Sequence, residues 1–326
     1  MTRIKVYCIN LTCLLFCLIT WGQEMETMRS PYSEDLIDQK IFLIVLGTVQ
    51  DAGSPHIACK KECCSPLFEN HDNSRKVVSL GLVDQVNFSK YLFEATPDLS
   101  TQMKELNNRG MVSKNETPDG IFLTHAHIGH YAGLMYLGKE AMNADQVAVF
   151  AMPKMTTYLE TNGPWDQLVT NKNIDLKGLE HQKKIELSKD VRVTPLLVPH
   201  RDEYSETVGY LIEGPNKTAL FLPDIDKWEK WDHDIIELIK KVDYAFIDAT
   251  FYDGMEINNR DISEIPHPFI IESMEKFRWL STEQKSKILF IHFNHTNPVL
   301  DPNSKATETV LKKGYNIARR NDRFEL

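Results

Sequence analysis

The sequence predicts an α/β fold built as one domain over residues 41–326. Three observations lead to this expectation. Short apolar segments of strand character alternate with helical segments along the chain, and no long linker divides them. Of the 326 residues, 42% are hydrophobic and 25% are charged, which is ordinary globular composition. This composition excludes a disordered chain, a collagen and a polytopic membrane protein.

The first apolar run sets the pattern for the other elements. Residues 41–47 (IFLIVLG) are continuous, short and β-branched, as in a buried strand. A loop rich in Gly, Ser and Pro follows over residues 48–75. Further strands are predicted over residues 77–83, 91–94, 121–123, 147–152, 191–198, 208–212, 219–222, 244–247 and 288–293. Helices are predicted over residues 98–107, 133–142, 154–160, 234–241, 269–280 and 305–313.

The amino terminus resembles an export signal. Arg3 and Lys5 precede an uncharged, largely apolar stretch that ends at Gly22. We interpret residues 1–22 as a cleaved signal peptide and residues 23–40 as a polar arm, so the protein is expected to be periplasmic or secreted. The alternative is an uncleaved membrane anchor, because about 18 apolar residues is the lower limit for a span. The polar residues Asn10 and Thr12 favour cleavage, after which no stable membrane insertion is expected.

The charge balance limits the possible partners. The formal net charge is −9, and no run of basic residues stands out. Binding to nucleic acid through neutralised phosphates is therefore not expected. A small-molecule substrate is the expected partner, and an anionic one would need metal ions to mediate its contact with an acidic protein.

The cysteines outside the amino-terminal segment form one tight cluster. Cys59, Cys63 and Cys64 lie within six residues, and their odd number does not suit a disulfide framework. Such a cluster with a distant histidine is typical of a structural zinc site. Three free thiols are the alternative, although bare thiols on an exported protein would be prone to oxidation.

Three histidines follow one predicted strand directly. His125, His127 and His130 come after residues 121–123. Alternate residues of an extended segment project the same way, so His125 and His127 can reach one ion while His130 reaches a neighbouring point. Neutral imidazole is the commonest side-chain ligand for zinc and similar ions. The sequence therefore predicts a metal site here rather than a chance cluster on a solvated loop.

Other candidate ligands also end apolar strands. His200 follows residues 191–198, Asp224 follows residues 219–222, and His292 lies in the FIHFNHTNP segment. In layered α/β folds, ligands gather at strand ends. A single residue of this kind is as often a cap or a buried hydrogen-bonding group, so the order of the set carries the information.

That order resembles the metallo-β-lactamase superfamily. The superfamily motif HxHxDH is followed by His, Asp and His, and this chain has THAHIGHYAGL followed by His200, Asp224 and His292. The segments VLGTVQDAGSPHIACKKECC and IHFNHTNP resemble the coenzyme PQQ synthesis protein B family, and the cysteine cluster is similar to that of phosphoribosyl cyclic phosphodiesterases. The resemblance covers about residues 41–300. It implies an αββα sandwich with the metal site at one edge.

The resemblance also implies a set of metal ligands. His125, His127 and His200 would hold one ion, and Asp224 would bridge to a second ion bound by His130 and His292. Gly129 stands where the motif has Asp, so the second ion would have only three ligands. Either one tightly bound metal or an unequal pair is therefore expected. Zinc is the first choice, with manganese or iron as alternatives because the ligand set decides selectivity.

Further roles come from the same resemblance. Cys59, Cys63, Cys64 and His295 would hold a structural zinc, although the Cys-x3-Cys-Cys spacing differs from that of the relatives. His267 matches a histidine that acts near the substrate, as a general acid or an orienting group. Its alternative role is a helix-entry histidine bonded to backbone. Asp248 would orient a ligand histidine, with a turn cap as its alternative. We interpret Asp226 as a helix cap.

The leading functional hypothesis is a metal-dependent hydrolase. A metal-activated water would attack an ester bond, with a phosphodiester, including a cyclic one, placed ahead of a carboxylic ester or lactam. His267 would protonate the leaving group. A second hypothesis is an iron-dependent oxidative enzyme related to PQQ biosynthesis. A third is a metal-binding protein without catalysis.

Overall fold

The computed structural model describes residues 40–110, 115–201, 203–257 and 264–326. The predicted signal peptide and residues 23–39 of the predicted arm lie outside this part of the chain. Among the described residues, no helix combines the length and apolar character needed to cross a membrane.

Two sheets of seven strands form within the described residues. The first sheet has the order β14-β1-β2-β3-β4-β5-β6 and the second has the order β13-β12-β11-β10-β9-β8-β7. The strands of the first sheet are β1 (Ile41–Gly47), β2 (Ser79–Asp84), β3 (Ser89–Phe93), β4 (Gly120–Phe122), β5 (Val147–Ala151), β6 (Ile174–Gly178) and β14 (Arg323–Glu325). Those of the second are β7 (Ile185–Glu186), β8 (Arg192–Leu197), β9 (Val208–Glu213), β10 (Thr218–Leu222), β11 (Tyr244–Asp248), β12 (Ile288–Ile291) and β13 (Asn316–Ile317).

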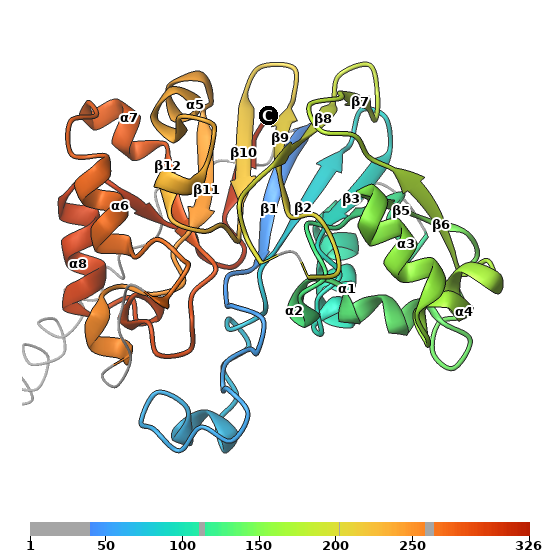
Figure 1. Ribbon diagram of the computed structural model, residues 1–326, viewed down its shortest axis with the longest axis horizontal. Coiled ribbons are helices and arrows are strands. Elements are labelled where there is room, and N and C mark those ends of the chain that lie inside the picture. The colour runs from blue at the N-terminus through green and yellow to red at the C-terminus, as the bar shows by residue number, and fades with distance from the viewer. Residues whose placement is uncertain (1–39, 111–114, 202, 258–263) are drawn as a thin grey trace, which may run out of the picture.

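Helices cover the outer face of each sheet (Figure 1). The helices are α1 (Leu99–Gly110), α2 (Ile128–Tyr131), α3 (Pro153–Thr161), α4 (Trp165–Thr170), α5 (Ile235–Lys241), α6 (Ile270–Lys276), α7 (Thr282–Ser286) and α8 (Lys305–Lys312). One buried cluster joins the first sheet to α1, α3 and α4, and another joins the second sheet to α5, α6 and α8. The predicted αββα sandwich is therefore confirmed.

The layer between the two sheets is rich in aromatic side chains. Phe93 and Phe122 stack with ring centroids 5.0 Å apart, and Phe93 meets Phe221 of the second sheet edge to face. Each such pair is worth about 0.5–1.5 kcal/mol beyond the area it buries. The alternating apolar residues of the strands supply this layer, because successive side chains point to opposite faces of a sheet.

The helix predicted over residues 133–142 is wrong in both position and type. The α-helix α2 begins earlier and is one turn long, and a 3₁₀ helix (Ala132–Leu137) follows it. Gly133 explains part of the difference, since a Cβ there would lie 2.0 Å from the Thr96 carbonyl oxygen. The close approach of backbone at Gly133 fixes a tight turn, and the extended conformation of Gly138 ends the segment.

The helix predicted over residues 269–280 is also too long. It ends at Lys276, and Ser281 then caps a new short helix, α7, in a reciprocal bond with Gln284. The short strands β7 and β13 have two residues each, and the sequence pattern did not predict them.

The strand ends position the candidate site. Strands β3 to β6 run parallel, as do β10 to β13. The segments that follow β1, β4, β10 and β12 carry Asp51, the histidine triplet, Asp224 and His292, respectively. Asp248 is the last residue of β11. Figure 1 shows that these strands end toward the same edge of the sandwich, from which the segment after β1 extends as a separate lobe.

Candidate metal centre

The histidine triplet begins three residues beyond the end of β4. His125 is fully buried, His127 stands in extended conformation just before α2, and His130 lies in the last turn of that helix. The Nε2 atom of His125 lies 2.8 Å from Nδ1 of His127. The predicted arrangement, with His125 and His127 meeting at one point, is therefore present in the structure.

The first group of converging atoms comes from His125, His127, His200 and Asp224. Nε2 of His200 lies 3.3 Å from Nδ1 of His127 and 3.2 Å from Oδ2 of Asp224. Nε2 of His125 is 3.3 Å from the same carboxylate oxygen. Ligands of a tetrahedral ion with bonds of 2.0–2.1 Å lie about 3.4 Å apart. These residues therefore fit a divalent metal ion.

Burial and charge set the protonation of this group. Burial, with the nearby charge of His130, holds the pKa of His125 well below its usual value, so its ring is neutral and can donate a lone pair. Burial opposes protonation of His200 as well, but Asp224 and Asp226 together raise its pKa to about 9. A cation bound between these groups would take the place of that proton.

The second group consists of Asp51, His130, Asp224 and His292. Oδ1 of Asp51 lies 3.0 Å from Nε2 of His130 and 3.3 Å from Nε2 of His292. Asp224 is common to both groups, and its Oδ2 lies 3.9 Å from Nε2 of His130. The sequence reasoning expected three of these residues to meet and did not include Asp51. Gly129 was the one sign in the sequence that pointed to Asp51, because a glycine in the motif implies that another segment of the chain could supply the missing ligand.

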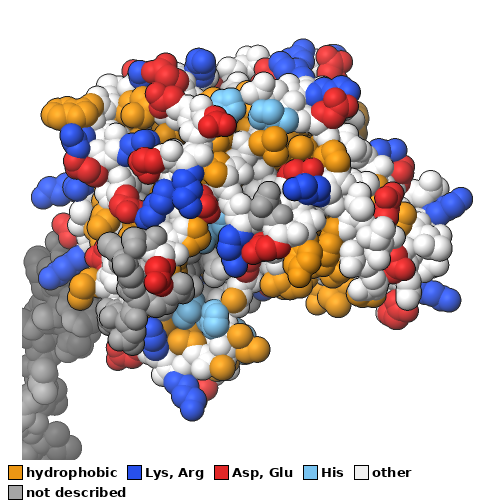
Figure 2. All heavy atoms as spheres, in the orientation of Figure 1, with side chains coloured by type: hydrophobic (Ala, Val, Ile, Leu, Met, Phe, Trp, Pro, Cys, Tyr) orange, Lys and Arg blue, Asp and Glu red, His pale blue; other side chains and the backbone are white. Residues whose placement is uncertain are grey.

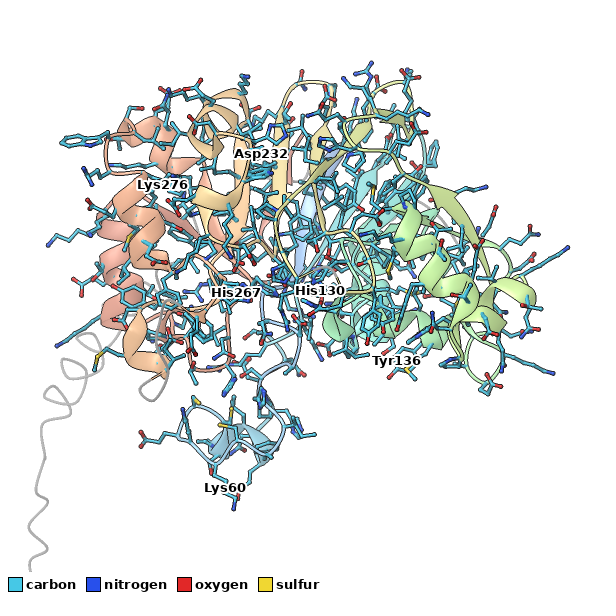
Figure 3. The ribbon with its side chains drawn as sticks, in the orientation of Figure 1. Lys60, His130, Tyr136, Asp232, His267 and Lys276 are labelled. Atoms are coloured by element: carbon cyan, nitrogen blue, oxygen red, sulfur yellow. The ribbon has the colours of Figure 1, made fainter. Side chains whose placement is uncertain are left out.

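His267 and Asp248 lie beside these groups. Nδ1 of His267 is 2.8 Å from Oδ2 of Asp248 and 3.1 Å from Oδ1 of Asp224. Although burial disfavours the charged ring, the two carboxylates raise the pKa of His267 well above its usual value. Asp248 also accepts hydrogen bonds from the Ile225 and Thr250 amides, so it both orients a histidine and caps a turn. Figure 3 shows His267 and His130 near each other, where the edges of the two sheets meet.

A buried glutamate and a buried aspartate orient the histidines from behind. Glu94 is fully buried, and its Oε1 lies 3.0 Å from Nδ1 of His130. Oδ1 of Asp226 lies 3.2 Å from Nδ1 of His200. Glu94 was not predicted from the sequence. The helix cap expected at Asp226 is wrong, because Lys227 precedes the 3₁₀ turn Trp228–Lys230 and no side chain caps it, while Asp226 contacts His200. A carboxylate on one ring nitrogen fixes the tautomer and leaves the other nitrogen for a metal.

The predicted zinc site assembles in the lobe that follows β1. Ligand atoms of Cys59, Cys63, Cys64 and His295 lie within 4.8 Å of one another. The cysteines are free thiols in the structure, and the ring of His56 packs on His295 with centroids 4.3 Å apart. Figure 3 shows this lobe extending away from the sandwich, with Lys60 near its far end. The donor set, three thiols and one imidazole, suits a structural zinc.

Comparisons with known proteins agree with this geometry. A family model described as a β-lactamase superfamily domain matches residues 89–293. Coenzyme PQQ synthesis protein B from Methylobacillus flagellatus is 24% identical, over 84% of this chain and 96% of the relative. The same protein from Nitrosococcus oceani is 25% identical, again over 84% of this chain and 96% of the relative.

Solved structures share the fold. Zn²⁺-bound PqqB from Methylobacterium extorquens has a TM-score of 0.71 at 20% identity, covering 87% of this chain and 100% of that one. A diphosphatase of the PhnP family has a TM-score of 0.60 at 21% identity, covering 88% and 97%. Human tRNase Z, short form, has a TM-score of 0.51 at 11% identity, covering 87% and 98%.

Proposed function

Because the chain belongs to the metallo-β-lactamase superfamily, we propose that it is a metal-dependent hydrolase that acts on an ester bond. The observation that carries the proposal is the pair of ligand groups that share Asp224. Metal ions held there would supply a Lewis acid and an activated water. A diphosphatase, which cleaves a phosphorus–oxygen bond, is among the structural neighbours, and this supports placing a phosphodiester, including a cyclic one, first among the proposed substrates.

The residues of the chain would act on the substrate in separate ways. The ring nitrogens of His125, His127 and His200 would bind the metal ion. Asp226 fixes the orientation of the His200 ring through its Nδ1 atom. Among the described residues, the hydrogen bonds of the His267 ring use Nδ1, which leaves Nε2 for the leaving group. His267 would donate its proton there as a general acid, held by Asp248.

The surface seen in Figure 2 does not favour a polyanionic substrate such as a nucleic acid. Figure 2 shows acidic and basic side chains interspersed over one face, without a broad basic patch. The formal net charge of −9 adds to this argument. A small anion would therefore be attracted by the metal centre and not by the surface.

The experiment that tests the proposal removes two metal ligands. The purified protein and a His125→Ala/His127→Ala variant are assayed on a panel of aryl phosphodiesters, cyclic phosphodiesters and carboxylic esters. We expect hydrolysis by the wild type and loss of at least about 100-fold in the variant, because the activated water depends on the ion. His71→Ala, which changes an exposed histidine, serves as the matched control. Undiminished hydrolysis by the double variant would refute the mechanism.

One comparison favours a second candidate function. The curated relatives at 24–25% identity are PQQ synthesis proteins, and they align over 96% of their own length. An iron-dependent oxidative enzyme related to that pathway is therefore the alternative. Oxygen uptake by the iron-loaded protein, without hydrolysis of any ester in the panel, would favour it.

Location is a separate proposal. The charge pattern of residues 1–22 supports export to the periplasm or the medium. The mass of the protein recovered from a Gram-negative expression host tests this, since cleavage after Gly22 would remove the first 22 residues.

A further inference from the structure

The metal-binding motif of this chain lacks one carboxylate. Gly129 occupies the position between His127 and His130 at which superfamily members carry Asp. The backbone of Gly129 lies within α2 and does not adopt the left-handed region, so its conformation does not require glycine. A glycine inside a helix costs about 0.5–1 kcal/mol relative to alanine. The reason for glycine must therefore be space.

Asp51 fills that space. A Cβ atom on residue 129 would lie 2.3 Å from Cα and 2.5 Å from Cβ of Asp51, and real Cβ contacts are not that short. Any side chain at position 129 would therefore push against the backbone of residue 51. Asp51 can therefore occupy its position only because residue 129 has no side chain.

The backbone holds Asp51 against the segment that carries His292. The amide of Gln50 donates to the Phe293 carbonyl at 2.8 Å, and the amide of Phe293 donates to the Thr48 carbonyl at 2.8 Å. Val49 and Phe293 form a parallel bridge. Two segments more than 240 positions apart in the chain are thus joined at the residue before Asp51 and at the residue after His292.

The carboxylate points at the second group of ligands. Oδ1 of Asp51 lies 3.0 Å from Nε2 of His130 and 3.3 Å from Nε2 of His292. Only 14% of its side chain is exposed, so water solvates it poorly. Placing a carboxylate there without a cationic partner would be costly.

We propose that Asp51 is a metal ligand that replaces the missing motif carboxylate, so that Asp51, His130, Asp224 and His292 form a complete site for a second divalent ion. The centre would then bind two ions with comparable affinity, whereas the motif predicts one ion or a pair of unequal affinity. This inference rests on the metal centre of the proposed hydrolase. The experiment that tests it measures metal binding, so its result does not depend on whether the protein hydrolyses an ester.

The test measures Co²⁺ binding to the full protein after active-site metal is removed with a chelator. Titration by calorimetry and visible absorption is expected to show two active-site Co²⁺ ions in the wild type. Asp51→Asn should weaken one of them by at least about 10-fold, since even outer-sphere changes cost 10- to 100-fold. Asp145→Asn, at an exposed aspartate, is the matched control.

A second variant tests the steric argument. Gly129→Ala should displace Asp51 and weaken the same ion, whereas Gly178→Ala, where nothing lies within 4 Å of an added Cβ, should not. Anomalous diffraction from a Co²⁺-loaded crystal should place an ion next to Asp51. Two ions bound by Asp51→Asn with wild-type affinity, or a crystal with no ion beside Asp51, would overturn the inference. A far-UV circular dichroism spectrum like that of the wild type shows that each variant is folded.

Discussion

Three histidines of the two ligand groups, His130, His200 and His292, have one ring nitrogen facing the group and the other facing a side chain that holds it. Glu94 contacts His130, Asp226 contacts His200, and Thr250 lies 2.9 Å from Nδ1 of His292. Such contacts fix the ring orientation and raise the basicity of the metal-facing nitrogen. The buried polar residues therefore matter to the centre almost as much as the ligands.

Glu94→Gln should lower metal affinity without removing a ligand. The amide keeps the shape of the side chain but loses the charge that fixes Nδ1 of His130. We expect a roughly 10- to 100-fold loss in affinity for an active-site ion, measured by Co²⁺ titration. Glu160→Gln, at an exposed glutamate on α3, is the control. Unchanged affinity in Glu94→Gln would mean that Glu94 only fills space.

Glu256 should make stability depend on pH. Burial raises the pKa of Glu256 to about 7 from the ordinary value of 4.5, despite hydrogen bonds from Thr296 and the Tyr252 amide. A folded-state pKa above the unfolded one gives stability that is present in full below about pH 4.5 and is lost as the pH rises through 7. The loss is on the order of 3 kcal/mol at most.

Urea denaturation of the wild type and Glu256→Gln between pH 4 and pH 8.5 measures this effect. The wild type should lose stability relative to the variant as the pH rises, because only the wild type must bury a carboxylate. Parallel stability curves would show that folding does not raise the pKa of Glu256.

The order of the residues, together with the superfamily resemblance, predicted which side chains would form most of the centre. His125, His127, His200, Asp224 and His292 each follow an apolar strand, so the sequence places them at one sheet edge. Asp51 and Glu94 were not predictable in the same way. Their roles depend on backbone pairing and packing between segments that are distant in the chain, and the resemblance assigned no ligand role to Asp51 although it lies in the VLGTVQDAGSPHIACKKECC segment.

Among the elements, the segment after β1 links the two metal sites. It carries Asp51 near its start and the three cysteines farther on, while the segment after β12 carries both His292 and His295. The same two stretches of chain therefore contribute to the active-site group and to the cysteine group. An ion at the cysteine site would hold both stretches together.

Removing the cysteine site should loosen this segment. Cys59→Ser/Cys63→Ser should lower the zinc content by about one ion per chain, because two of four ligands are lost. Proteolysis within residues 51–75 should become faster, and the ion bound next to Asp51 should weaken while the ion at His125 and His127 does not. Lys60→Ser, in the same lobe, is the control. Equal zinc content in the variant and the wild type would exclude a zinc site at these cysteines.

The four strands that the sequence did not predict, β6, β7, β13 and β14, all lie at sheet edges. β7 and β13 are two residues long, and β14 has charged residues, Arg323 and Glu325, on either side of a single apolar one. Strands at sheet edges bury few side chains, so they lack a clear alternating pattern. The long buried strand β1, in contrast, was predicted with its correct bounds.

At the scale of the whole molecule, the candidate centre joins the two sheets. Asp51 and the histidine triplet follow strands of the first sheet, whereas Asp224, Asp248 and His292 lie at the ends of strands in the second. Phe324 of β14 makes a further connection, because it is in the first sheet and packs on Tyr244 and Phe246 of the second. Aromatic packing thus holds the interior, while the metal ligands meet at one edge.

Metal binding should therefore stabilise the entire sandwich. An ion that binds the native state but not the unfolded chain adds about 2.7 kcal/mol at 100 times its Kd. For a domain of this size, that corresponds to a rise in Tm of roughly 5 °C. Calorimetry of chelator-treated and metal-loaded protein measures the rise, with the structural zinc confirmed in both samples. His125→Ala/His127→Ala should show a smaller rise and His71→Ala the full one. Equal Tm values for loaded and chelator-treated wild type would mean that the ligand groups do not bind metal in solution, because an ion held by both sheets must raise the free energy of unfolding.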